Sequence, residues 1–184
     1  MILKADGYNY HRFYGWRLIA LLIVFAAYTL WFTGPGPFGQ LARLEGYDFL
    51  QARGFYSGAE AVAAIEALDA QGRAVKFKAL GFDLIYMVLQ TLVFEAVMAF
   101  GLTALGLISS RWRWLLLAPM GFLMFDFLES GFLTLVMMTA SATLGSFAGV
   151  FTLLKYAFFL PLCSLTVGLG VAGVAAGLLR KRKG

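Results

Sequence analysis

Four long apolar runs constrain this chain more than any other feature, because each is long enough to cross a lipid bilayer. They cover residues 17–33, 79–108, 115–139 and 147–179. A bilayer core of about 30 Å needs about 20 helical residues at 1.5 Å each, with a lower limit of about 17. The first run, which starts at Arg17, meets that limit. The sequence therefore predicts an all-α membrane protein, a four-transmembrane-helix bundle.

The composition favours the same class. Hydrophobic residues make up 61% of the 184 residues and charged residues 14%, whereas soluble domains have about 45–50% and about 25%. The 21 glycines and 18 phenylalanines fit as well, since small residues permit close helix contacts in lipid and aromatic side chains fill the gaps. We expect residues 1–184 to form one integral membrane domain.

The basic residues indicate an orientation. Lysine and arginine gather in the N-terminal segment, in the turn at 111–113 and in the tail at 180–183. Four spans place these three regions on one side, and the side rich in Lys and Arg faces the cytoplasm. The other side receives the uncharged turn at 140–146 and a long loop of balanced charge. Both termini are therefore expected in the cytoplasm, and the net charge of +5 is not taken as a sign of nucleic-acid binding.

The long loop after the first span carries its own helix signal. Ser57 and Glu60 form a capping box, which predicts a helix over about 58–71 with Gly72 as its stop. Apolar residues recur there every three positions. We expect this helix in the first extracytoplasmic loop to lie flat on the membrane surface or to pack on the outer rim of the bundle.

Polar side chains inside the apolar runs are the sharpest functional signal. Asp126 and Glu129 are three residues apart, so they share one face of a helix. A charge that faces lipid costs at least about 2.5–3.5 kcal/mol, so these groups are expected to face inward. The candidate polar or ligand-binding cluster consists of Asp83, Tyr86, Asp126, Glu129, Lys155 and Tyr156.

Three carboxylates and one ammonium at similar depth leave a negative excess. Lys155 is expected to pair with Asp126 or Glu129. A remaining carboxyl group would then be protonated, or reached by a basic side chain from the outer edge of the bundle. The candidates for that contact are Arg73, Lys76 and Lys78.

Three roles remain open for this cluster. Buried ion pairs can fix the register of membrane helices, the cluster can form a site for a ligand, a lipid head group or a proton, or it can meet another membrane subunit. Glu95 is expected to serve helix packing or an interface. The pairs Gly145 and Gly149, and Gly173 and Gly177, have the spacing of close helix contacts, with oligomerisation as the less favoured option.

Several chemistries lack the residues they need. The sequence contains no Walker loop, Rossmann glycine pattern or HExxH motif. His11 is the one histidine and Cys163 the one cysteine, which excludes an intrachain disulfide, a cysteine metal cage and a Ser-His triad within the membrane. We assign no catalytic residue, cofactor or metal from the sequence.

A set of motifs resembles an uncharacterised family of small four-span bacterial membrane proteins. That family has a Tyr-Ser-x-x-Glu loop helix followed by Gly-Arg, an Asp-x-x-Glu-Asn in the third span and a Leu-Lys-aromatic sequence in the fourth. Ser130 stands where the family has Asn. The resemblance implies a four-span fold in a bacterial inner membrane and names no activity. The matching residues are Tyr56, Ser57, Glu60, Gly72, Arg73, Asp83, Tyr86, Asp126, Glu129, Leu154, Lys155 and Tyr156.

The sequence favours a non-catalytic accessory or scaffold subunit of a larger membrane complex, with membrane lipids as neighbours and no nucleic acid. The alternative is a small membrane enzyme or carrier that uses the polar cluster on a lipid-like or protonated substrate. The two differ in one observable feature. A carrier or enzyme needs a cavity that opens to the outer surface or to lipid, whereas a structural cluster should be dry, closed and fully paired.

Overall fold

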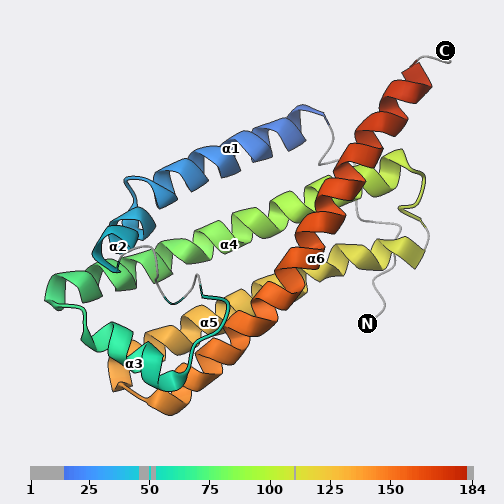
Figure 1. The fold of residues 1–184 in the computed structure, drawn as a ribbon. Coiled ribbons are helices and arrows are strands. Elements are labelled where there is room, and N and C mark those ends of the chain that lie inside the picture. The colour runs from blue at the N-terminus through green and yellow to red at the C-terminus, as the bar shows by residue number, and fades with distance from the viewer. Residues whose placement is uncertain (1–14, 46–49, 51–52, 110, 182–184) are drawn as a thin grey trace.

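The computed structural model describes residues 15–45, 50, 53–109 and 111–181. Every regular element in these ranges is a helix, and the helices form one elongated bundle (Figure 1). The expected interfacial segment before Trp16, with His11, and the end of the basic C-terminal tail lie outside the described residues.

Four helices are long and apolar enough to cross a membrane, counting the short extensions at their ends. They are α1 (Trp16–Thr33), α4 (Ala70–Ala104), α5 (Ala118–Thr139) and α6 (Ala142–Lys181). The start of α1 and the end of α6 lie at the same end of the bundle (Figure 1). The chain is thus an all-α, multi-pass membrane protein, and the predicted four-helix bundle is confirmed.

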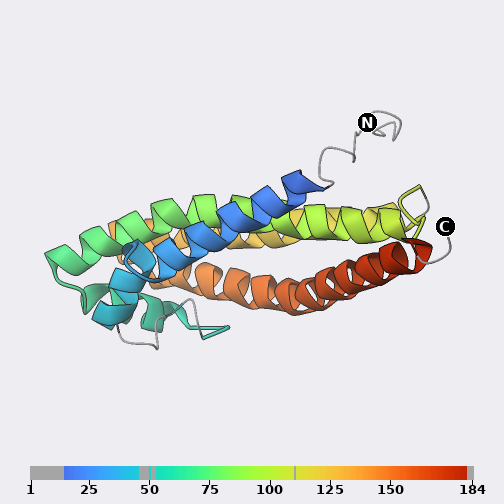
Figure 2. The ribbon, with the colours of Figure 1, turned by 90° about the horizontal axis from the view of Figure 1, so that it is seen from above.

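Two spans begin earlier than the sequence predicted. α4 starts at Ala70 rather than at residue 79, and α6 starts at Ala142 rather than at residue 147. With 35 and 40 residues, they measure roughly 50 and 60 Å, so both are longer than a hydrocarbon core of about 30 Å. Pro161, which cannot donate a backbone hydrogen bond, stands at the middle of α6. Figure 2 shows that α6 is bent near its middle.

The structure contains a short helix that the sequence analysis did not predict, α2 (Pro37–Glu45). Proline fits its first position, because the N–H that proline lacks has no partner there in any helix. α2 folds back tightly after α1, and a Cβ atom at Gly39 would lie 2.0 Å from the carbonyl oxygen of Gly34. The rings of Phe32 and Phe38, 5.2 Å apart, pack across this turn.

The capping box is present at the start of α3 (Gly58–Glu66), as predicted. The predicted end of this helix is wrong. Asp69 begins a new helix, because its carboxylate accepts a hydrogen bond from the amide of Gly72 over 2.6 Å. Gly72 therefore belongs to the first turn of α4 and does not stop α3.

α3 packs on the rim of the bundle, against α6 and α5. The contact depends on small residues, since a Cβ atom at Gly58 would lie 1.8 Å from the carbonyl oxygen of Ala142. A Cβ atom at Gly149 would lie 2.0 Å from the carbonyl oxygen of Tyr56. Gly145 and Gly149 thus serve helix packing, as expected. Gly173 packs on α4 in the same way, whereas Gly177 faces open space.

The remaining packing leaves α1 at the side of the bundle. α4, α5 and α6 contact one another extensively, and the 3₁₀ helix η4 (Arg111–Leu117) joins α4 to α5. α1 packs mainly on α4 and α2, and Figure 1 shows it diverging from α6. This divergence determines where the candidate site opens.

Candidate ligand site

The polar residues of three helices lie at equal distances from one end of the bundle. Asp83 is thirteen positions after Ala70, Asp126 is thirteen before Thr139, and Lys155 is thirteen after Ala142. These three helix ends lie at the same end of the bundle (Figure 1), and thirteen residues span about 20 Å. Asp83 therefore lies deeper than the sequence suggested, because α4 begins earlier than predicted.

Lys155 joins the two carboxylates of α5. Its ammonium group donates a hydrogen bond to Oδ1 of Asp126 over 3.0 Å and a second hydrogen bond to Oε2 of Glu129. The side chains of Lys155, Asp126 and Glu129 are 12%, 8% and 0% exposed. The sequence predicted a pair with one carboxylate or the other, and the structure contains both.

The other oxygen of Glu129 is held from α6 and from the loop before α3. The hydroxyl of Thr152 donates to Oε1 of Glu129 over 2.6 Å. The hydroxyl of Tyr56 lies 3.4 Å from the same oxygen, which makes a weak hydrogen bond. Burial, together with the charge of Glu129, raises the pKa of Tyr56, so its phenol stays protonated and can donate.

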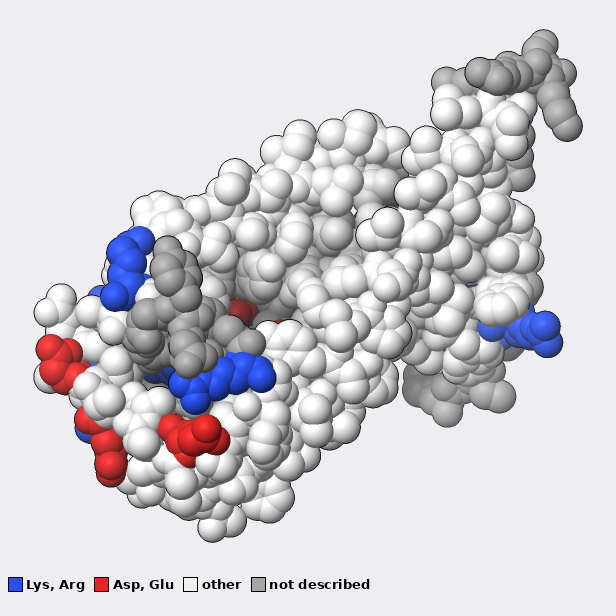
Figure 3. Space-filling model, in the orientation of Figure 1, with Lys and Arg blue, Asp and Glu red and all other residues white. Residues whose placement is uncertain are grey.

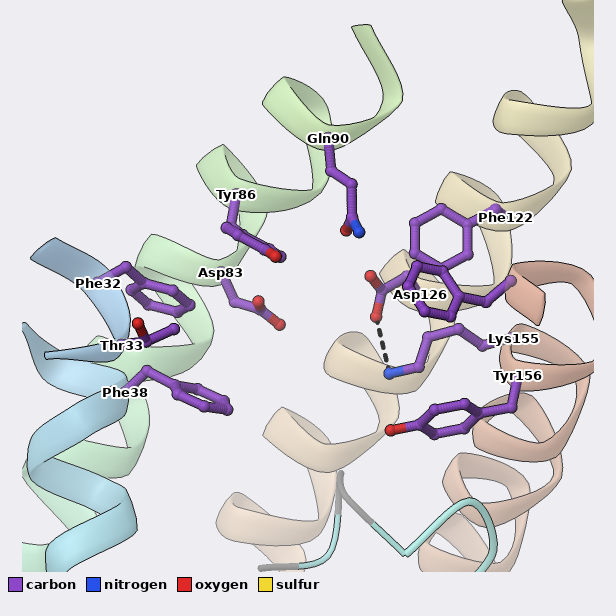
Figure 4. A pocket seen from close by; sticks show the side chains of 11 residues that line it. Phe32, Thr33, Phe38, Asp83, Tyr86, Gln90, Phe122, Asp126, Lys155 and Tyr156 are labelled. Atoms are coloured by element: carbon purple, nitrogen blue, oxygen red, sulfur yellow. Dashed lines mark hydrogen bonds and ion pairs between the residues drawn. The ribbon is translucent and has the colours of Figure 1, made fainter. Parts of the chain in front are cut away.

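A cavity of about 240 Å³ lies beside these ion pairs. In the close view of Figure 4, Asp83 projects from α4 across the cavity, with Asp126 and Lys155 on the far side. Six of the eleven lining residues are aromatic, so the wall is largely apolar. The lining consists of Phe32, Thr33, Phe38, Asp83, Tyr86, Gln90, Phe122, Asp126, Lys155, Tyr156 and Phe159.

The cavity opens at the side of the bundle. Its lining comes from α1 and α2 on one side and from α6 on the other, with α4 and α5 behind. On this face the space-filling view has a hollow with an acidic surface at its bottom (Figure 3). Since the helices run along the bundle, a sideways opening faces the region where acyl chains surround a membrane protein.

Two polar side chains of α4 face the cavity outside the ion pairs of Lys155. Asp83 forms no ion pair within the part of the chain that the structure describes. The predicted contact from Arg73, Lys76 or Lys78 is therefore not formed with Asp83. Gln90 is only 9% exposed, its amide points into the cavity (Figure 4), and it forms no hydrogen bond with any described residue.

The other predicted residues divide into three groups. Tyr86 and Tyr156 line the cavity. Glu129 lies behind the cavity wall, fully buried under Lys155. Glu95 is half-buried twelve positions further along α4 and does not reach the cavity.

The described residues contain no group of three or more His, Cys, Asp or Glu side chains that could hold a metal ion. Cys163 is half-buried outside the cavity lining.

Some functional residues that the sequence analysis missed carry a signal in their spacing. Gln90 is seven residues after Asp83, Phe122 is four before Asp126 and Phe159 is four after Lys155. These intervals place each of them on the same helical face as a predicted residue. The contributions of α1, α2 and the loop residue Tyr56 have no such signal, because they come from outside the three helices.

No protein-family model, curated protein sequence or solved structure matches this chain. What the site does is therefore inferred from its geometry.

Proposed function

We propose that this protein binds an amphiphilic molecule that enters from the bilayer, as a lipid-binding protein or carrier. The single observation that supports this function is the cavity that opens sideways between α1 and α6. Its wall combines aromatic rings with Asp83, Asp126 and Lys155. An amphiphile would place its polar group against these three side chains and extend its apolar part outward.

The size of the cavity limits what can enter it. A volume of about 240 Å³ lies below the range of about 300–1,000 Å³ typical of small-molecule pockets. It equals the volume that roughly eight water molecules occupy in the liquid, at about 30 Å³ each. The cavity therefore accommodates a head group with a few carbon atoms, and a longer chain would lie in the opening between the helices.

A purely structural role explains only half of the polar cluster. Asp126, Glu129 and Lys155 are buried and mutually paired, as expected of groups that fix helices. Asp83 and Gln90 face the cavity instead, outside these ion pairs. The polar group of a bound ligand would contact both side chains.

Binding is favoured over catalysis because two of the three charged groups of the lining are already paired. Asp126 and Lys155 are bound to each other, and the remaining polar residues are a carboxylate, an amide, a threonine and two tyrosines. We therefore propose a non-catalytic function for the site.

The scaffold role that the sequence favoured is the second candidate, because the ion pairs hold α5 and α6 together. Purification from the native membrane separates the two roles. A stoichiometric partner protein with no bound amphiphile would support the scaffold, and a bound amphiphile without a partner would support the carrier.

We also propose a bacterial inner membrane with both termini in the cytoplasm. The start of α1, the end of α6 and the basic turn of η4 lie at one end of the bundle (Figure 1), and basic ends face the cytoplasm. The motif resemblance to small four-span proteins supports the bacterial assignment.

Partial blocking of the opening tests the binding function. Thr33, an exposed residue of the lining, is the last residue of α1. We expect Thr33→Trp to lower the amount of lipid-like molecule that co-purifies with the protein, measured by native mass spectrometry. Thr139→Trp is the matched control, because Thr139 is an exposed threonine at the end of α5 outside the lining. Equal occupancy in both variants, or no bound amphiphile in the wild type, would contradict the proposal.

A further inference from the structure

We infer that the molecule bound in this cavity is an amphiphilic amine, whose ammonium group lies between Asp83 and Asp126. The inference rests on the proposed function of the same cavity and names the chemistry of the ligand. Charge balance, an unpartnered amide and the aromatic wall support it separately.

The charges around the cavity leave room for one more cation. Asp83, Asp126 and Glu129 supply three carboxylates, and Lys155 supplies one ammonium that is shared by Asp126 and Glu129. Asp83 has no cation within ion-pair distance among the described residues. A ligand ammonium beside Asp83 would reduce the negative excess in a region of low dielectric constant, where an unpaired charge is most costly.

The same arrangement disfavours an anionic head group. An ammonium has three N–H groups, and Lys155 uses two of them on Asp126 and Glu129. At most one remains for a ligand. An incoming phosphate or carboxylate would also lie beside Asp83 and Asp126, which repel it.

Gln90 can accept a hydrogen bond from an ammonium group. Its side chain is nine-tenths buried and faces the cavity (Figure 4). The amide offers an acceptor oxygen as well as two N–H donors. A protonated amine has enough N–H groups to reach this oxygen as well as the two carboxylates.

The aromatic wall fits a cation with an apolar body. Phe32, Tyr86, Phe122, Tyr156 and Phe159 surround the polar groups. A ring face attracts a cation within about 6 Å of its centre, more strongly where water is excluded. The same rings would contact the carbon chain of the ligand as it leaves toward the bilayer.

Three probes with the same chain and different head groups test the inference: dodecylamine, dodecanol and dodecanoate. Each is titrated at pH 7 into the full-length protein in a nonionic detergent, and binding is followed by native mass spectrometry and by thermal unfolding. We expect the amine to bind about tenfold more tightly than the other two, or more, because charge-assisted hydrogen bonds are the stronger ones.

Two variants locate the effect. Asp83→Asn should weaken the binding of dodecylamine about tenfold and leave the binding of dodecanol unchanged. Glu95→Gln removes a carboxylate of the same helix away from the cavity, so it should change neither. Thermal unfolding of each variant without ligand shows whether it folds, and the comparison of head groups on the wild type does not depend on either variant.

The outcomes separate the inference from the proposed function. Equal binding of amine and alcohol, or tighter binding of dodecanoate, would overturn the inference that the head group is positive. The proposed binding of an amphiphile would still hold. Binding of none of the probes would overturn both. Lysophosphatidylethanolamine distinguishes two classes of natural ligand. Binding as tight as that of dodecylamine indicates a membrane aminolipid, and weaker binding indicates an amine without phosphate. Either result supports a ligand with an ammonium head group.

Discussion

Lys155 of α6 and Glu129 of α5 form an ion pair in which the carboxylate is completely buried. Asp126 extends this pair, with its Oδ1 3.0 Å from the ammonium nitrogen. The two helices also share the most extensive contact of the bundle. The ion pairs therefore fix α5 against α6 at the depth where the cavity begins.

Lys155→Met should destabilise the bundle by about 3–5 kcal/mol, because it leaves two buried carboxylates without their cation. Thermal or denaturant unfolding in detergent measures the loss. Lys78→Met is the control, since Lys78 lies exposed on α4, and it should change stability little. An unfolding midpoint for Lys155→Met equal to that of wild type would contradict the structural importance of the pair.

Thr152→Val should cost about 1–3 kcal/mol, because it removes the 2.6 Å hydrogen bond to buried Glu129 at nearly constant volume. Tyr56→Phe should cost less, since the tyrosine hydroxyl is 3.4 Å from the same carboxylate. Thr134→Val, which loses only a bond to the carbonyl of Ser130 within its own helix, serves as the reference. The order of the three unfolding midpoints checks the prediction, and a larger loss for Tyr56→Phe than for Thr152→Val would refute it.

Gly149→Ala should destabilise the contact between α6 and the loop before α3 by about 1–3 kcal/mol. Its new Cβ atom would meet the carbonyl oxygen of Tyr56 at 2.0 Å, so the loop has to move. Gly168→Ala is matched to it, because Gly168 lies on the same helix with nothing within 4 Å. This control should be neutral or slightly stabilising. Unfolding of both variants in one detergent tests the difference, and equal midpoints would show that the contact is looser than described.

The capping box of α3 should weaken in acid. Hydrogen bonds from the backbone and side chain of Ser57 lower the pKa of Glu60 from its ordinary value of 4.5. A lowered pKa stabilises the folded state above the ordinary value, and this contribution disappears as the pH falls through the folded-state pKa. Ser57→Ala removes the hydroxyl and keeps the amide, so it should raise the pKa of Glu60 part of the way toward 4.5, as measured by NMR titration of its carboxyl carbon. An unchanged pKa in the variant would show that the hydroxyl of Ser57 does not lower it.

The parts of the site that follow helical spacing could be predicted from the sequence. Asp126 and Glu129 share a face because they are three residues apart, and the cost of charge in lipid turns that face inward. The pairing of these carboxylates with Lys155 follows from the similar depth of the three side chains in the bilayer. Asp83 lies deeper than the sequence predicts, because α4 begins at its N-cap Asp69, ahead of the apolar run at residue 79.

The cavity could not be predicted in this way. Its existence depends on the angle at which α1 leaves α4, and on the fold-back of α2 that brings Phe38 to the wall. Tyr56 reaches Glu129 from a loop 73 positions away in the sequence. Such contacts are set by tertiary packing, and no local pattern in the chain encodes them.

The most direct test of the central claim is a cryo-electron microscopy map of the protein in lipid nanodiscs that contain a long-chain amine. We predict elongated density that enters between α1 and α6 and ends beside Asp83 and Asp126, with Lys155 bound to Glu129. A map in which α1 packs against α6 and closes the cavity, or in which Asp83 faces lipid, would contradict the account.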